Sequence, residues 1–65
     1  MMKYKIEIWK WHNMVQAYES DDVEDVLSWY KANWHWCYEC GNCSFSVYQD
    51  GKELSFEEED AIGFF

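Results

Sequence analysis

Apolar and polar residues alternate along the first part of the chain. Tyr4, Ile6 and Ile8 occupy every second position, and Lys5 and Glu7 lie between them. A period of two is typical of a β-strand, so we expect a strand over residues 3–11. His12-Asn13 can turn the chain, and the alternation over Met14–Tyr18 predicts a returning strand.

The spacing then changes to that of a helix. Asp21 is suited to cap a helix, and Glu24 lies at the position that completes a capping box. The apolar stripe that follows predicts an amphipathic helix over about residues 21–34. We expect residues 35–42 to form a loop. The stripe consists of Val23, Val26, Leu27, Tyr30 and Trp34.

Two further strands are expected in the last third. The alternation over Cys43–Tyr48 predicts a third strand, Asp50-Gly51 is typical of a two-residue hairpin turn, and Glu53–Glu57 alternates as a fourth strand. The predicted order is β-β-α-β-β. The sequence therefore predicts an α+β fold, a small two-layer single domain over residues 1–65, with one helix packed on an antiparallel sheet.

One helix covers only one face of a sheet. Alternation assigns seven residues to the covered face: Tyr4, Ile6, Ile8, Phe45, Val47, Leu54 and Phe56. Trp9, Trp11 and Tyr48 then point to the opposite side, and the tail residues Phe64 and Phe65 offer a second apolar contact. Exposed apolar patches often mark interfaces, and a homodimer is the economical way to bury both.

The composition fits a folded domain reinforced by aromatic burial. The chain has 65 residues, of which 49% are hydrophobic and 22% aromatic, and this excludes a disordered acidic tail. The first eleven residues lack the apolar core of a signal peptide, and no stretch is apolar enough to span a membrane. We expect a cytoplasmic protein.

Negative charge is the strongest chemical feature of the chain. The formal net charge is -8, although residues 1–18 carry three lysines against one glutamate. Such a field attracts positively charged partners and repels nucleic acid and anionic membranes. Ten carboxylates fall in two clusters: Glu19, Asp21, Asp22, Glu24, Asp25, and Glu53, Glu57, Glu58, Glu59, Asp60.

Two interpretations of these clusters stay open. They form either an ordinary solvated surface, or a row of carboxylates that imitates the phosphates of DNA, which carry one charge per roughly 3.4 Å of each strand. Cation binding is a weak third alternative, because no acidic loop has the central glycine of a calcium motif.

The three cysteines admit several interpretations. Their odd number and the missing signal peptide argue against a disulfide framework, so we expect reduced, packed thiols without a cofactor. A zinc site is the alternative, with His12 as a more distant ligand, and a redox pair is another. The alternative zinc ligands are His35, Cys37, Cys40 and Cys43.

Catalysis and direct nucleic-acid binding are not expected. No glycine-rich oxyanion loop or nucleophile elbow accompanies the histidines and cysteines, so the chain is predicted not to be an enzyme. The aromatic residues between Trp29 and Tyr38 are of the kind that stack on bases. Binding of single strands also needs a positively charged groove, and this chain has the opposite sign.

The acidic runs Glu19–Asp25 and Glu57–Asp60, in a small compact chain, give a resemblance in composition to a functional family. The chain resembles small acidic phage proteins that take over host functions, several of which mimic DNA. It is similar in kind to phage inhibitors of the nucleoid-associated protein HU, which dimerise and occupy its DNA-binding surface. Other members block RNA polymerase, restriction enzymes, CRISPR effectors or uracil-DNA glycosylase. The resemblance implies a location in the host cytoplasm.

The leading hypothesis is a non-enzymatic inhibitor that binds a basic DNA-binding host protein through its two acidic clusters and competes with DNA. The alternative is a small zinc-stabilised adaptor that docks on a partner protein through Trp9, Trp11 and Tyr48.

Overall fold

The computed structural model has four strands and two helices within its described residues, in the order β-β-α-β-β-α. It describes the backbone of residues 2–40 and 43–65 and the side chains of residues 2–34 and 43–65. The elements are β1 (Tyr4–Lys10), β2 (Asn13–Ser20), α1 (Val23–Cys40), β3 (Cys43–Gln49), β4 (Lys52–Glu53) and α2 (Phe56–Ile62). The predicted α+β class with an antiparallel sheet is confirmed. A second helix, α2, was not predicted, and it begins within the predicted fourth strand.

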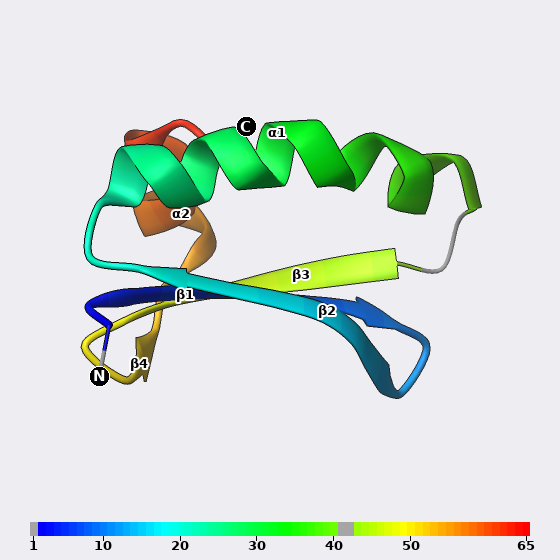
Figure 1. Cartoon of the computed structure of the whole chain (residues 1–65), viewed down its shortest axis with the longest axis horizontal. Helices are drawn as coiled ribbons and strands as arrows, with labels where there is room; N and C mark the ends of the chain where they lie inside the picture. Colours follow the sequence, from blue (N-terminus) through cyan, green and yellow to red (C-terminus); the bar gives the residue numbers. More distant parts are fainter. Residues whose placement is uncertain (1, 41–42) are drawn as a thin grey trace.

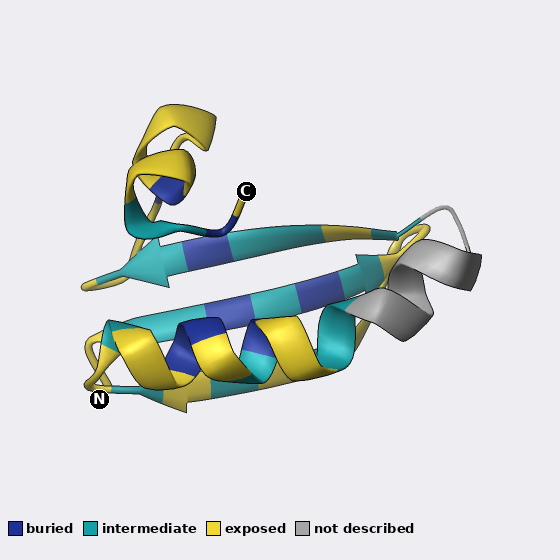
Figure 2. Cartoon of the chain, turned by 90° about the horizontal axis from the view of Figure 1, so that it is seen from above, coloured by how far each residue is buried: buried dark blue, intermediate teal, exposed yellow. Residues whose placement is uncertain are grey.

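The sheet has the strand order β2-β1-β3-β4, and all its pairs are antiparallel. Because β2 and β3 both run antiparallel to β1, they are parallel to each other. They are therefore joined by a crossover, which is α1. Both helices lie on the same side of the sheet (Figure 1). Seen from above, α1 lies over the β1–β2 side and α2 lies beyond β3 (Figure 2). The other face of the sheet carries no helix among the described residues.

The first hairpin turns one residue earlier than expected. Lys10 pairs with Asn13, so the turn is Trp11-His12, and Trp11 takes the left-handed conformation with φ 58°. The register shifts after Ile8, which leaves Val15 as the extra residue of a β-bulge in β2.

Helix α1 differs from its predicted bounds at both ends. The cap is Asp22 instead of Asp21, because the Asp22 Oδ1 atom accepts a hydrogen bond from the Glu24 backbone N–H at 3.0 Å. The helix also continues to Cys40, so the loop predicted over residues 35–42 is wrong for residues 35–40. No proline or glycine interrupts this stretch before Gly41, and the helix can therefore extend.

The predicted fourth strand is mostly wrong. Only Lys52–Glu53 pairs with β3, and the chain then enters α2. Ser55 caps this helix: its Oγ atom accepts the Glu58 N–H at 3.3 Å, and Glu58 Oε1 accepts the Ser55 N–H at 3.1 Å. This reciprocal capping box follows from the local sequence Ser-x-x-Glu. It favours a helix here, whereas the predicted strand rested on only two alternating apolar residues, Leu54 and Phe56.

The core lies between the two helices and the sheet. Tyr30 of α1 is at its centre, with ring centroids 4.8 Å from Phe45 and 5.1 Å from Phe64. Phe56 was predicted to be in the core but is 65% exposed, whereas Phe64, predicted as an external contact, is 4% exposed. The turn at Gly63 that ends α2 directs Phe64 back onto the core. The main buried cluster consists of Ile6, Val26, Leu27, Tyr30, Val47, Leu54 and Phe64.

Neither helix, as far as its residues are described, has the length and apolar character needed to cross a membrane.

Replacing Ser55 by Ala tests the capping box. The substitution removes the acceptor for the Glu58 N–H, and the free energy of unfolding should fall by about 1 kcal/mol. Ser28→Ala, on an exposed position of α1, is the control and should leave stability unchanged or slightly higher. Urea unfolding followed by circular dichroism measures both. An S55A variant as stable as the parent chain would contradict this account of α2.

Candidate functional site

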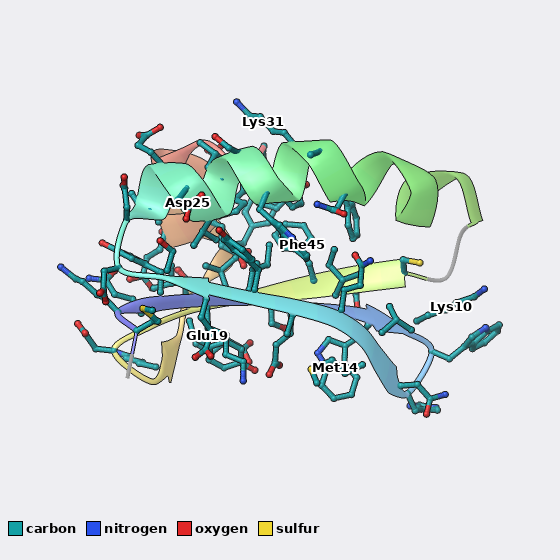
Figure 3. The ribbon with its side chains drawn as sticks, in the orientation of Figure 1. Lys10, Met14, Glu19, Asp25, Lys31 and Phe45 are labelled. Carbon is teal, nitrogen blue, oxygen red and sulfur yellow. The ribbon has the colours of Figure 1, made fainter. Side chains whose placement is uncertain are left out.

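The fold brings the two acidic clusters to one end of the molecule. The first turns of α1 and α2 and the β3–β4 turn all lie at this end (Figure 1), and Lys10 lies at the other (Figure 3). We call this surface the acidic end. It consists of Glu19, Asp21, Asp22, Glu24, Asp25, Glu53, Glu57, Glu58 and Asp60. All nine side chains are exposed.

Three carboxylates of the first cluster are fixed by hydrogen bonds. Asp21 Oδ1 accepts the Lys3 backbone N–H at 2.9 Å, and Asp22 caps α1. Asp25 Oδ2 accepts the Tyr18 hydroxyl at 2.8 Å, which raises the pKa of Tyr18 above its usual value. Each carboxylate keeps a second oxygen, so these acids have fixed positions and remain exposed.

The second cluster is organised around the start of α2. The Ser55 backbone and side chain hydrogen-bond the Glu58 carboxylate and lower its pKa. Glu57 and Asp60 lie on the same short helix and are exposed. Acids in a first helical turn also interact favourably with the helix dipole. Helix formation therefore offsets part of the repulsion among these like charges.

Glu59 was assigned to the acidic surface from the sequence, and the structure instead places it among the buried residues. It is 8% exposed and lies on the inner side of α2. Burial raises the pKa of its carboxyl, a hydrogen bond from the Val47 backbone opposes the rise, and the charge of Glu53 adds to it. Sequence reasoning missed this role because a run of four acids gives no indication of which one faces inward.

The helix-free face of the sheet carries a polar network centred on Glu7. Lys5 Nζ lies 3.1 Å from Glu7 Oε2, and Trp9 Nε1 donates to Glu7 Oε1 at 3.3 Å. Burial raises the pKa of Glu7, but hydrogen bonds from Lys5, Trp9 and Tyr48 outweigh it, and the net pKa is lowered. The sequence analysis did not single out Glu7, although its alternation with Lys5 and Trp9 already places all three on one face.

The aromatic residues predicted to form an interface occupy two separate places. Trp9, Trp11 and Tyr48 line one shallow hollow of about 330 Å³ on the helix-free side, together with His12, Ser44 and Ser46. The tail is different, because Phe64 is in the core and only Phe65 is exposed. The Phe65 ring packs against Phe56 with centroids 4.5 Å apart.

The cysteine region is described only in part. Cys43 is disulfide-bonded, so the prediction that the three thiols are reduced is wrong for this residue. The side chains of the other alternative zinc ligands, His35, Cys37 and Cys40, lie outside the described residues. Within the described part of the chain no group of three His, Cys, Asp or Glu residues is arranged to hold a metal ion. A disulfide-bonded Cys43 is not available as a zinc thiolate, and zinc binding by the other candidates stays a prediction.

Comparisons of the chain with protein-family models, curated proteins and solved structures gave no match. The surfaces of the chain itself are therefore the basis for proposing its function. Among these surfaces, the acidic end has the largest group of like charges, its nine exposed carboxylates.

The raised pKa of Glu59 predicts a specific pH dependence of stability. A folded-state pKa above the ordinary 4.5 means that the protonated form is favoured in the folded chain. Stability is therefore lost as the pH rises through the folded pKa. Glu59→Gln should remove this loss, so the variant should gain stability relative to the parent as the pH rises from 4.5 toward neutrality.

Glu58→Gln is the matched control with the opposite sign. The pKa of Glu58 is lowered in the folded chain. The parent should therefore be more stable than Glu58→Gln at pH values above the ordinary carboxyl pKa of 4.5, and this difference in stability should shrink as the pH falls. Thermal unfolding across this pH range measures both. If Glu59→Gln followed the same trend as Glu58→Gln, the burial assigned to Glu59 would be wrong.

Proposed function

We propose that the protein is a non-enzymatic inhibitor that binds a basic DNA-binding host protein and competes with DNA. The observation that carries the proposal is the gathering of nine exposed carboxylates at one end of a 65-residue chain. Carboxylates presented at short intervals on a small body match a surface built to bind phosphates. A nucleoid-associated protein such as HU is a partner of this kind.

The arrangement of the acids supports a binding role beyond solubility. Asp21, Asp22 and Asp25 are held by hydrogen bonds, so little side-chain freedom is lost when they meet a partner. The side chains of Glu24, Glu57 and Asp60 make no hydrogen bond or ion pair within the described residues. The acidic end thus combines fixed carboxylates with others that are available to cationic side chains.

The aromatic hollow supports a second candidate function. Trp9, Trp11 and Tyr48 line it together, and Trp11 is 66% exposed. Tryptophan and tyrosine are enriched among the residues that dominate binding energy at protein interfaces. An adaptor that docks on a protein partner through this hollow is the alternative, and it would depend on apolar contact rather than on charge.

Competition for HU tests the leading proposal. The protein should displace a labelled DNA duplex from HU, and displacement should weaken steeply as the salt concentration rises. The triple variant Glu24→Gln, Glu57→Gln, Asp60→Asn should weaken displacement roughly tenfold, because it removes three exposed charges and no hydrogen bond. Electrophoretic mobility of the duplex is the readout.

Glu59→Gln is the control, since the same chemical change at a buried site leaves the acidic end intact. Capture from nuclease-treated bacterial lysate, eluted with a salt gradient, extends the test to other basic proteins. The proposal fails if no basic DNA-binding protein is retained, or if the triple variant competes as well as the parent. Retention that resists high salt and is lost on Trp11→Ala would favour the adaptor.

A further inference from the structure

The outer edge of β2 has backbone groups that pair with no other strand in the described structure. The strand order β2-β1-β3-β4 puts β2 at one edge of the sheet. The opposite side is covered in part. Beyond the short β4, the Leu54 N–H donates to the Val47 carbonyl at 2.8 Å, and Glu59 accepts from the Val47 backbone. Strand β3 is therefore covered from Val47 to Gln49, whereas β2 has no neighbouring strand on its outer side within the described residues.

The hydrogen bonds around β3 and the strand register fix which backbone groups of β2 point outward. The backbone N–H and carbonyl of Val47 point toward the β4 side. Those of the next residue, Tyr48, therefore point toward β1, where Tyr48 pairs with Lys5. The bond of 2.8 Å from the Asp50 N–H to the Lys3 carbonyl has the same direction. Backbone groups alternate in direction along a strand, so Ile6 bonds toward β2.

Ile6 pairs with Tyr18, which places the backbone groups of Tyr18 inside the sheet. Those of Ala17 and Glu19, one residue to either side, then point away from β1. Toward the hairpin, the bulge at Val15 ends the regular edge. The part of β2 that can accept another strand is therefore residues 16–20.

A carboxylate lies on each side of this edge, and the one on the helix-free side is opposite Lys5 in the register. On the helix side, Tyr18 stacks on Trp29 with centroids 5.3 Å apart and donates its hydroxyl to Asp25. On the helix-free side stands Glu19, and Asp21 follows at the end of the strand. A strand added here would meet a carboxylate on each of its faces.

We propose that β2 binds an extended, lysine- or arginine-containing segment of the partner as a fifth strand of the sheet. This inference rests on the proposed function, because it supplies the means by which a basic partner is held. Main-chain hydrogen bonds to Ala17 and Glu19 give affinity, and the carboxylates of Glu19 and Asp25 select basic side chains. A second copy of this chain fits poorly, since pairing two β2 edges brings the same carboxylates together.

Amide exchange on the unaltered protein tests the proposal directly. The probe is a synthetic peptide rich in lysine and threonine, and the control peptide has glutamate in place of each lysine. With the probe bound, exchange at the Ala17 and Glu19 amides should slow at least tenfold, whereas Tyr18, already bonded within the sheet, should change little. Equal exchange at Ala17 and Glu19 with and without bound probe would overturn the proposal. Protection by the glutamate peptide would overturn the selection for basic side chains.

Ala17→Pro adds a second test. Proline removes an N–H that faces outward, so the bonds between β1 and β2 are kept, as edge positions allow. The variant should bind the lysine peptide at least tenfold more weakly. If it bound the peptide and displaced DNA from HU as the parent does, strand addition would be wrong while the proposed function stood. If the parent failed to displace DNA but its Ala17 and Glu19 amides were protected by the peptide, the proposed function alone would fail.

Discussion

The central strand β1 is the constraint on which the other parts depend. Ile6 and Ile8 are fully buried, and β1 pairs with both β2 and β3. Because alternate residues of a strand face opposite sides, the burial of these two isoleucines also fixes Lys5, Glu7 and Trp9 on the helix-free face. A shift of one residue in register would exchange the two sets and put charged side chains under α1.

The chain tolerates its concentrated negative charge by placing it where backbone structure can use it. Asp22 and Glu58 accept hydrogen bonds from backbone N–H groups at the start of the two helices, and Asp21 accepts one from Lys3. These bonds and the helix dipoles offset part of the repulsion among like charges. An array of acids that is locally stabilising can also face a cationic partner, so the structural and the proposed binding roles of these residues are compatible.

The two edges of the sheet differ in what limits further strand pairing. On the β3 side, α2 supplies a buried carboxylate, Glu59, that accepts from the Val47 backbone beyond the end of β4. On the β2 side, the bulge at Val15 and the charge of Glu19 are features that natural proteins use to discourage uncontrolled pairing of an open edge. They leave a short edge that a segment of the right charge can still approach.

Local patterns in the sequence were sufficient for much of this architecture. The period of two in β1 and β3, the helical spacing from Val23 to Trp34 and the Asp50-Gly51 turn each depend on neighbours close in the chain, and the α+β class follows from them. The capping box at Ser55 is equally local, and a short alternation hid it. Tertiary packing decided the rest. It buried Phe64 instead of Phe56, turned the Glu59 side chain toward the interior, and brought both acidic clusters to one end of the molecule. These features depend on contacts between segments distant in the sequence, which no local pattern encodes.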